Sequence, residues 1–173
     1  MLDVKKAQAA LDSIRERSHT PSISVTLVID GETISLFSGL RDVENGIPAG
    51  PDTMYAIGSS TKAFVAAALC ILCDDGRLDL DDPVKKYIPE LEMYDSYVTE
   101  HLTVRDILCH RCGLPRHEMT WYPRMETVTP AELVHRLRYL KPSAPFRYTM
   151  QYQNHMFMLA GYLVERITGQ KWE

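Results

Sequence analysis

The 173-residue sequence lacks any long hydrophobic run and any excess of one charge sign. Its longest apolar stretch, Ala63 to Cys73, has 11 residues and is followed at once by Asp74. A helix needs about 20 apolar residues to span a bilayer, so we expect no membrane span. The 19 Lys and Arg and the 23 Asp and Glu are scattered along the chain, for a net charge of -4. This pattern does not suit binding to nucleic acid, which we exclude as a partner.

The N-terminus lacks the apolar segment of an export signal. Ala7-Gln8-Ala9 has the small residues of a cleavage site, but no apolar run precedes it. We therefore expect a cytoplasmic chain, unless an export signal has been removed. With 45% hydrophobic residues, the chain suits one domain with a real core, or part of one, and is too short for two ordinary domains.

The four cysteines form two pairs with the spacing of zinc ligands, Cys70/Cys73 and Cys109/Cys112. The first pair lies inside the apolar run of a predicted helix, where cysteine usually behaves as a small buried hydrophobic residue. Structural zinc sites normally place such pairs in tight turns rather than in a helix core. A zinc protein remains an alternative, but we expect no metal and no cofactor.

Strands are expected only near the start of the chain. Residues 22–28 and 33–38 have the alternating, β-branched character of two strands, and Ile29-Asp30-Gly31-Glu32 supplies the turn of a hairpin. Before them, residues 3–18 have the spacing of an amphipathic helix that packs on a sheet. Residues 39–55 are predicted to be a loop. Two strands alone are marginally stable, so this hairpin needs more sheet than the sequence visibly provides.

Everything after residue 55 that can be assigned is helical. A helix from Ser59 to about Cys73 is apolar on nearly all sides, which predicts a central, buried position. Two further helices begin with capping-box patterns, Thr103–Asp106 and Thr129–Glu132, and the second has its buried face at Leu133, Leu137 and Leu140. A last helix is predicted from Tyr152 to Ile167, with Gly169 as its stop.

Ser59 and Lys62 have the spacing of a nucleophile and its base. A serine hydroxyl is a weak nucleophile at neutral pH and needs a base within hydrogen-bond reach. Three positions along a helix, Lys62 lies on the same face one turn further, so its amine can reach the hydroxyl. The pattern alone is weak, because Ser59 or Ser60 could instead cap the helix and Lys62 could be an ordinary solvated side chain.

The context of these residues resembles the β-lactamase and penicillin-binding-protein family, in particular class C β-lactamases and related esterases, D-aminopeptidases and DD-carboxypeptidases. The resemblance spans about residues 22–169 and consists of ordered motifs. They are the nucleophile stretch Asp52–Phe64, the connector Leu78–Val84, the segment Val104–Pro115 with its H-x-x-G-L-P turn, the Y-x-N motif Tyr152-Gln153-Asn154, and the helix Leu159–Gly169.

The resemblance implies an α+β fold of the β-lactamase and transpeptidase type, with helices packed on an antiparallel sheet. It also implies roles for four residues. Ser59 would be acylated, Lys62 would accept its proton, and Tyr152 would act with Lys62 as general base and then protonate the leaving group. Asn154 would hydrogen-bond the substrate. A half-buried core tyrosine is the alternative for Tyr152.

Other polar residues receive lesser roles. His110 resembles the family's structural turn histidine, and we expect backbone carbonyls to satisfy it rather than a role in a catalytic triad. Cys112 replaces the family's usual small hydroxyl residue, with no evident chemistry. His117, Glu118, Trp121 and Tyr122 are ligand-binding residue types that we place at the entrance of the site.

The family's third motif, a Lys or His followed by Ser or Thr and then Gly, does not occur in this sequence. That motif supplies an oxyanion-hole amide, and losing one such donor costs about 10² to 10³ in turnover. We therefore expect residues 1–173 to be the N-terminal portion of a single β-lactamase-like domain, inactive alone, with the C-terminal part as a second chain or a missing segment. The expected substrate is a small-molecule or short-peptide ester or amide, and a homo-oligomer is left open. The alternative is a non-catalytic binding or scaffolding module.

Overall fold

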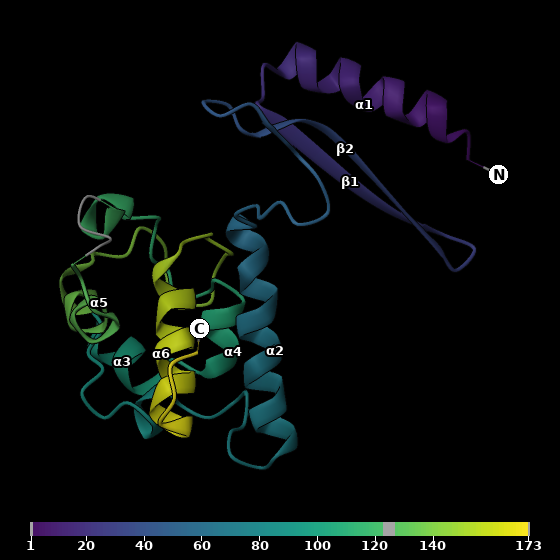
Figure 1. Cartoon of the computed structure of the whole chain (residues 1–173). Coiled ribbons are helices and arrows are strands. Elements are labelled where there is room, and N and C mark those ends of the chain that lie inside the picture. The colour runs from purple at the N-terminus through teal and green to yellow at the C-terminus, as the bar shows by residue number, and fades with distance from the viewer. Residues whose placement is uncertain (1, 123–126, 173) are drawn as a thin grey trace. The chain divides into compact units, whose positions relative to one another are not determined.

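The computed structural model describes residues 2–122 and 127–172 (Figure 1). They form two compact units, Met1–Ala56 and Ile57–Glu173. Within the described ranges, no helix combines the length and the apolar character that crossing a membrane requires.

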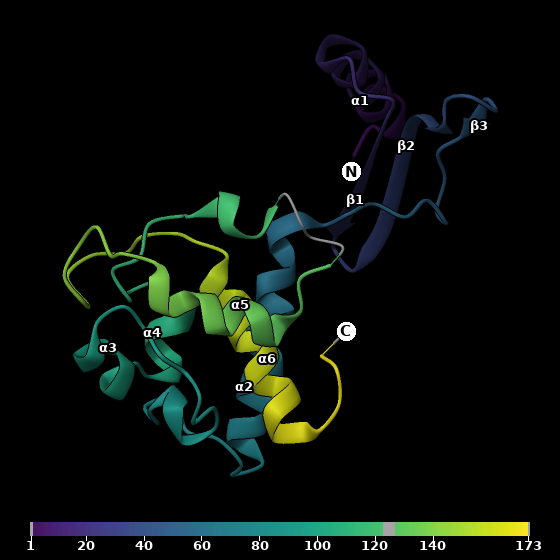
Figure 2. The same cartoon turned by 90° about the vertical axis from the view of Figure 1, so that its left-hand side faces the viewer.

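The first unit is a small antiparallel sheet with one helix. Strands β1 (Ser22–Ile29), β2 (Glu32–Asp42) and β3 (Ile47–Pro48) lie in the order β1-β2-β3, and β3 is visible in Figure 2. The predicted hairpin is confirmed, with Val25 opposite Leu36. The prediction of a loop from residue 39 is wrong at its start, because β2 continues to Asp42 and pairs with β3.

Helix α1 (Val4–Ser18) packs on β2, as its amphipathic pattern predicts. Leu11 is its buried residue, and Nε of Arg15 donates to the Ser38 hydroxyl at 2.9 Å. Val4 and Ile14, which share the predicted apolar face, are each 45% exposed. Only the middle of that face is therefore buried.

The second unit is helical. Its elements are η1 (Gly58–Ser60), α2 (Thr61–Asp74), η2 (Val84–Lys86), α3 (Ser96–His101), α4 (Val104–Leu108), η3 (Glu118–Thr120), α5 (Pro130–Arg136), η5 (Leu137–Tyr139) and α6 (His155–Thr168). Helix α6 packs against α2, α4 and α5, so it is the central helix of this unit (Figures 1 and 2). Among the residues it buries are Met156, Leu159 and Leu163.

Both predicted capping boxes are present. The Thr103 side chain accepts from the Asp106 amide at the start of α4, and Thr129 and Glu132 do the same for α5. The expected buried face of Leu133, Leu137 and Leu140 is also confirmed. Helix α3 was not predicted, although Asp95 caps it with hydrogen bonds to two amides.

The prediction that α2 is central and buried holds for only one of its faces. Val65, Leu69 and Leu72 join the core, whereas Phe64 and Ile71 are 63% and 60% exposed. Cys70 on the same helix is exposed as well. Apolar residues therefore lie on nearly all sides of this helix, but the described residues cover only one of them.

An ion pair between half-exposed Arg147 and buried Asp106 joins α4 to the segment before α6. Asp106, whose side chain is 7% exposed, accepts from Nε and Nη2 of Arg147 at 2.9 and 2.7 Å. Burial opposes ionisation of this carboxyl, but the hydrogen bonds from Arg147 and Thr103 prevail and hold its pKa below the usual range. The pair thus fixes the chain that leads to Tyr152.

Candidate active site

Ser59, Lys62 and Tyr152 meet at the N-terminal end of α2. The hydroxyl of Ser59 lies 2.6 Å from the phenol oxygen of Tyr152, and Nζ of Lys62 donates to the Ser59 oxygen at 3.2 Å. Lys62 also lies against the face of the Tyr152 ring, 4.8 Å from its centroid. A hydroxyl, an amine and a phenol therefore share one hydrogen-bonded cluster, through which a proton can be exchanged.

The local backbone explains how Ser59 enters this cluster. Gly58 has a φ of 53°, and Ser59 follows it in the single turn of η1, immediately before α2. The N-cap residue of α2, Ser60, makes no side-chain cap hydrogen bond, so the capping interpretation is wrong for it. The Ser59 hydroxyl is instead directed to Tyr152 and Lys62.

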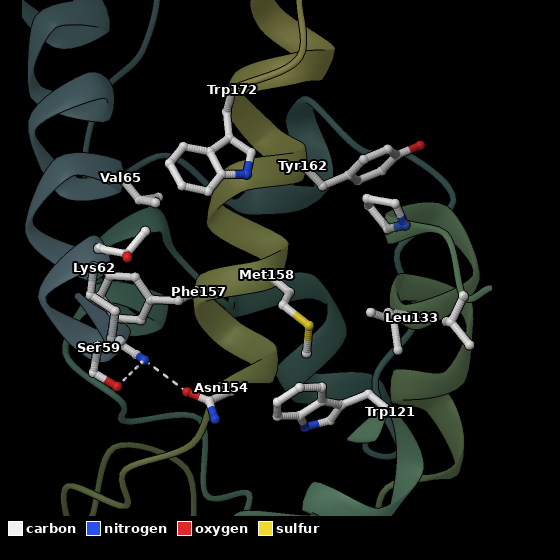
Figure 3. A pocket seen from close by; sticks show the side chains of 14 residues that line it. Ser59, Lys62, Val65, Trp121, Leu133, Asn154, Phe157, Met158, Tyr162 and Trp172 are labelled. Atoms are coloured by element: carbon white, nitrogen blue, oxygen red, sulfur yellow. Dashed lines mark hydrogen bonds between the residues drawn. The ribbon is translucent and has the colours of Figure 1, made fainter. Parts of the chain in front are cut away.

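Asn154 completes the cluster. Its Oδ1 accepts from Nζ of Lys62 at 2.7 Å, so the amine bridges Ser59 and Asn154 (Figure 3). Tyr152 and Asn154 lie just before α6, which begins at His155. The prediction that Tyr152 is helical is therefore wrong, and Tyr152 and Asn154 lie in the non-helical segment before α6 instead.

Buried neighbours hold that segment in place. The Gln153 amide donates to Nδ1 of His110 at 3.4 Å, and the Gln151 amide donates to the His110 carbonyl at 2.9 Å. His110 is therefore a structural residue, bonded to a backbone N–H rather than to the carbonyls we expected. Burial, and then the charge of Lys62, lower its pKa, which favours the neutral ring that can accept this bond.

Gln153 itself is fully buried. Its Nε2 donates to the Cys112 sulfur at 3.1 Å, and its Oε1 accepts from the Met156 amide at 3.3 Å. Cys112, to which no role was assigned from the sequence, thus anchors the middle of the Y-x-N segment. Burial raises the pKa of its thiol, so it stays neutral.

The phenol of Tyr152 is more acidic than an ordinary tyrosine. The interaction with Lys62 lowers the pKa of Tyr152 most, and the hydrogen bond to Ser59 lowers it further. Together they outweigh the partial burial, which raises the pKa. A lowered pKa increases the fraction of phenolate near neutral pH, and the phenolate is the form that accepts a proton. The arrangement therefore suits Tyr152 to proton transfer with Ser59.

A second set of contacts surrounds Asn154 and was not predicted in detail. The Glu118 carboxylate accepts from Nδ2 of Asn154 at 3.2 and 3.3 Å, and from Nε of Arg116 at 3.1 Å. The Arg116 guanidinium lies 5.6 Å from the Tyr152 ring centroid. Glu118 was expected near the entrance only because of its residue type. Its partner, Asn154, lies 36 positions further along the chain, so no local pattern links the two residues.

A cavity of about 610 Å³ opens beside Ser59, Lys62 and Asn154 (Figure 3). Its remaining walls are largely apolar and come mainly from α2, α5 and α6. They include Trp121, Leu133, Phe157, Met158, Tyr162 and Trp172. Trp172 packs directly on Gly161, where an added Cβ would lie 2.9 Å from its ring. Of the loop residues expected at the entrance, Trp121 lines the cavity, whereas His117 bonds the Lys141 carbonyl and Tyr122 is exposed.

The cysteine pairs do not form a metal cluster. Cys70 and Cys109 are exposed, Cys112 is buried, and all four thiols are free. In residues 2–122 and 127–172, no three His, Cys, Asp or Glu side chains gather as metal ligands would. The zinc hypothesis therefore has no set of ligands in the described part of the chain.

The model of the Beta-lactamase family matches residues 7–173. The chain belongs to the β-lactamase family. It is 37% identical to the "Unguisins hydrolase ungD'" of Aspergillus campestris over 164 residues, which are 91% of this chain and 30% of that protein. The chain thus spans about a third of the length of this relative.

Solved structures agree with this assignment. The octameric penicillin-binding protein homologue from Pyrococcus abyssi matches 99% of this chain with a TM-score of 0.86 and 29% identity, over 41% of its own length. The D-amino acid amidase from Ochrobactrum anthropi SV3, in complex with D-phenylalanine, matches 99% with a TM-score of 0.84 and 30% identity, over 47% of its length. The predicted β-lactamase-like α+β fold is confirmed. The relatives named here thus include a hydrolase and an amidase.

Proposed function

We propose that this chain carries the nucleophile and proton-transfer groups of a serine hydrolase that acts through an acyl-enzyme. The observation that supports this most strongly is the contact of the Ser59 hydroxyl with both Tyr152 and Lys62, at 2.6 and 3.2 Å. A hydroxyl with a phenol and an amine in reach has the base that its activation requires.

The reaction divides into two acyl transfers. The Ser59 oxygen attacks the carbonyl carbon of an ester, amide or peptide, and its proton passes to the base formed by Lys62 and Tyr152. When the bond to the leaving group breaks, Tyr152 returns that proton to the leaving oxygen or nitrogen. A water molecule then attacks the acyl-enzyme with the same groups as base, which releases the acid and restores Ser59. The Asn154 Nδ2 group has two hydrogens, so it can donate one to the substrate while it keeps its contact with Glu118.

The cavity supports a substrate with an apolar group beside the reacting carbonyl. It begins at Ser59 and continues between Trp121, Leu133 and Met158 (Figure 3). Its volume lies in the range of small-molecule sites, about 300 to 1,000 Å³. The substrate class is therefore a small-molecule or short-peptide ester or amide with an apolar or aromatic side group.

The two compact units are proposed to be parts of one catalytic domain, completed by strands and a third motif that residues 1–173 do not contain. The coverage of the relatives supports this, because the whole chain corresponds to 41% of the Pyrococcus abyssi protein. Those further residues, in the same or a second polypeptide, are needed for activity. The octameric state of that relative makes a homo-oligomer worth testing. A cytoplasmic location stays a prediction from the residues.

Pre-steady-state hydrolysis of a p-nitrophenyl ester by the full-length protein tests the proposal. An acyl-enzyme mechanism predicts a burst of about one nitrophenolate per site before slower turnover, and no burst in Ser59→Ala. A phenylacetate ester should exceed an acetate ester in kcat/KM. The alternative, a non-catalytic binding or scaffolding module, predicts neither burst nor turnover in the wild-type protein, and that result would reject the proposal.

A further inference from the structure

The amide of Asn154 has two orientations, and its neighbours select one of them. On one side, Nζ of Lys62 offers only donors, and on the other the Glu118 carboxylate offers only acceptors. In the observed orientation, Oδ1 faces the Lys62 amine (Figure 3). Nδ2 faces the Glu118 carboxylate. Turning the amide by 180° would oppose donor to donor and acceptor to acceptor. Glu118 therefore acts together with Lys62 to fix which atom of Asn154 meets the amine.

Glu118 is itself held at two points. Nε of Arg116 donates to its Oε1 at 3.1 Å, and the Glu118 side chain is only 27% exposed. Glu118 also begins η3, whose last residue, Thr120, lies with its hydroxyl 2.7 Å from Nε2 of His155. His155 is the first residue of α6 and follows Asn154 directly. The carboxylate and the amide are thus mounted on elements that are bonded to each other.

This tether is insensitive to pH near neutrality. The Thr120 hydroxyl donates to the His117 carbonyl at 2.7 Å, which leaves its oxygen to accept from His155 Nε2–H. Burial lowers the pKa of His155 to about 4, so its ring is neutral above pH 5. Arg136 adds a hydrogen bond from Nη1 to the Thr120 carbonyl at 2.9 Å. The bond between η3 and α6 therefore does not change with the protonation of His155 above pH 5.

We propose that Glu118 is a positioning residue, which acts through Asn154 to keep the Lys62 amine directed at Ser59 and Tyr152. Asn154 Oδ1 holds Nζ at 2.7 Å, and that nitrogen in turn lies 3.2 Å from the Ser59 oxygen. If the amide turns, Lys62 loses its acceptor and moves away from the hydroxyl. The inference rests on the proposed function for its effect on rate, but its first step, the orientation of Asn154, is independent of activity.

Two substitutions separate this role from others. Glu118→Gln keeps the shape of the side chain but introduces an N–H donor, so residue 118 can then pair with either orientation of Asn154 and only Lys62 still favours the original one. Glu118→Asp keeps an acceptor-only carboxylate on a shorter side chain. Glu92→Gln is the matched control, because Glu92 accepts from Arg138 at 2.7 Å in an exposed surface pair.

The first readout is the side-chain amide signal of Asn154 in the NMR spectrum of the full-length protein, assigned with Asn154→Asp. In the wild type it should be a single, exchange-protected NH₂ pair. In Glu118→Gln it should shift and exchange faster or split into two, whereas Glu92→Gln leaves it unchanged. An unchanged signal in Glu118→Gln overturns the inference, whether or not the protein is active.

The second readout is the rate at which an uncharged fluorophosphonate modifies Ser59 between pH 5 and 10. Misplacing a catalytic group by about 1 Å costs about 100-fold, so we expect Glu118→Gln to be 10- to 100-fold slower with a displaced pH profile. Glu118→Asp should recover part of the rate, and Glu92→Gln should stay within twofold of wild type.

The outcomes distinguish the two proposals. A wild-type protein that fails to react rejects the proposed function but leaves the NMR test of Glu118 intact. A wild-type protein that reacts, with Glu118→Gln equal to it at every pH, rejects the role of Glu118 alone. If Glu118→Gln changed only KM, and only for substrates with an amino group, Glu118 would be a substrate receptor and the inference would be wrong.

Discussion

The Ser59 hydroxyl lies 2.6 Å from the Tyr152 phenol oxygen, although 93 positions separate the two residues. The contact joins the turn just before α2 to the non-helical segment before α6. It depends on a buried scaffold, because His110 and Gln153 fix that segment through the bonds described above. The chemistry of the site and the stability of the second unit are therefore linked, and the following predictions test each in turn.

The acidity of Tyr152 should depend on Lys62. Because Lys62 is the main cause of the lowered pKa of Tyr152, Lys62→Met should move that pKa up, toward the ordinary value of about 10. NMR titration of the protein labelled with ¹³C at the tyrosine ζ-carbon measures it directly. Tyr148 is 80% exposed and serves as an internal control that should not respond. A Tyr152 pKa that is the same in both proteins would contradict this account of the site.

The ion pair of Asp106 and Arg147 should contribute to stability. Arg147→Met leaves the buried Asp106 carboxylate with only its hydrogen bonds from Thr103, and because Arg147 is 43% exposed we expect a loss of about 1 to 3 kcal/mol. Asp81→Asn breaks the exposed pair with Arg105 and should cost less than about 1 kcal/mol. Urea unfolding of the full-length variants measures both values. Equal, small losses would mean that the Asp106 pair does not lock α4 to the segment before Tyr152.

Stability should fall when His155 must take up a proton. Its pKa is near 4 in the folded protein and 6.5 in the unfolded chain, so the unfolded state binds more protons between these values. The neutral His155 ring therefore makes its full contribution to the free energy of unfolding above pH 6.5. This contribution, up to about 3 kcal/mol, is lost as the pH falls toward 4. His110, whose pKa is also lowered, acts in the same direction.

His155→Gln tests the assignment of this pH dependence, since the glutamine amide can replace Nε2 in the bond to Thr120 but does not titrate. Urea unfolding at pH 7 and pH 5 should show a smaller difference for the variant than for wild type. The same difference in both proteins would show that other groups cause it.

Cys112 should tolerate serine better than alanine. Serine keeps an acceptor for the Gln153 amide, whereas Cys112→Ala leaves that buried N–H group without its partner, at a cost of about 1 to 3 kcal/mol. Thermal unfolding of the two variants compares them at nearly equal volume. If serine is as destabilising as alanine, the packing of the sulfur matters more than the hydrogen bond.

Local signals in the sequence predicted local structure well. The Asp30-Gly31 turn and the Thr103 and Thr129 caps each depend on a few adjacent residues, and all are present. The exposure of Phe64 and Ile71 could not be predicted, because apolar composition says nothing of what covers a helix face. The position of Tyr152 outside α6 was missed because the apolar periodicity of the helix continues close to its start.

The site was predicted unevenly. The resemblance named Ser59, Lys62, Tyr152 and Asn154, and their polar atoms lie within hydrogen-bond reach of one another, but their catalytic roles stay predictions. Glu118 and Cys112 could not be given roles, because each acts through a partner about 40 positions away that no local pattern reveals.

Mapping the adduct of a fluorophosphonate probe by mass spectrometry tests the central claim most directly. In the folded, full-length protein, we predict one adduct on Ser59, its absence in Ser59→Ala and its retention in Ser60→Ala, since the neighbouring Ser60 lacks the contacts to Tyr152 and Lys62 that Ser59 makes. No adduct on Ser59, or equal modification of Ser60, would contradict the account.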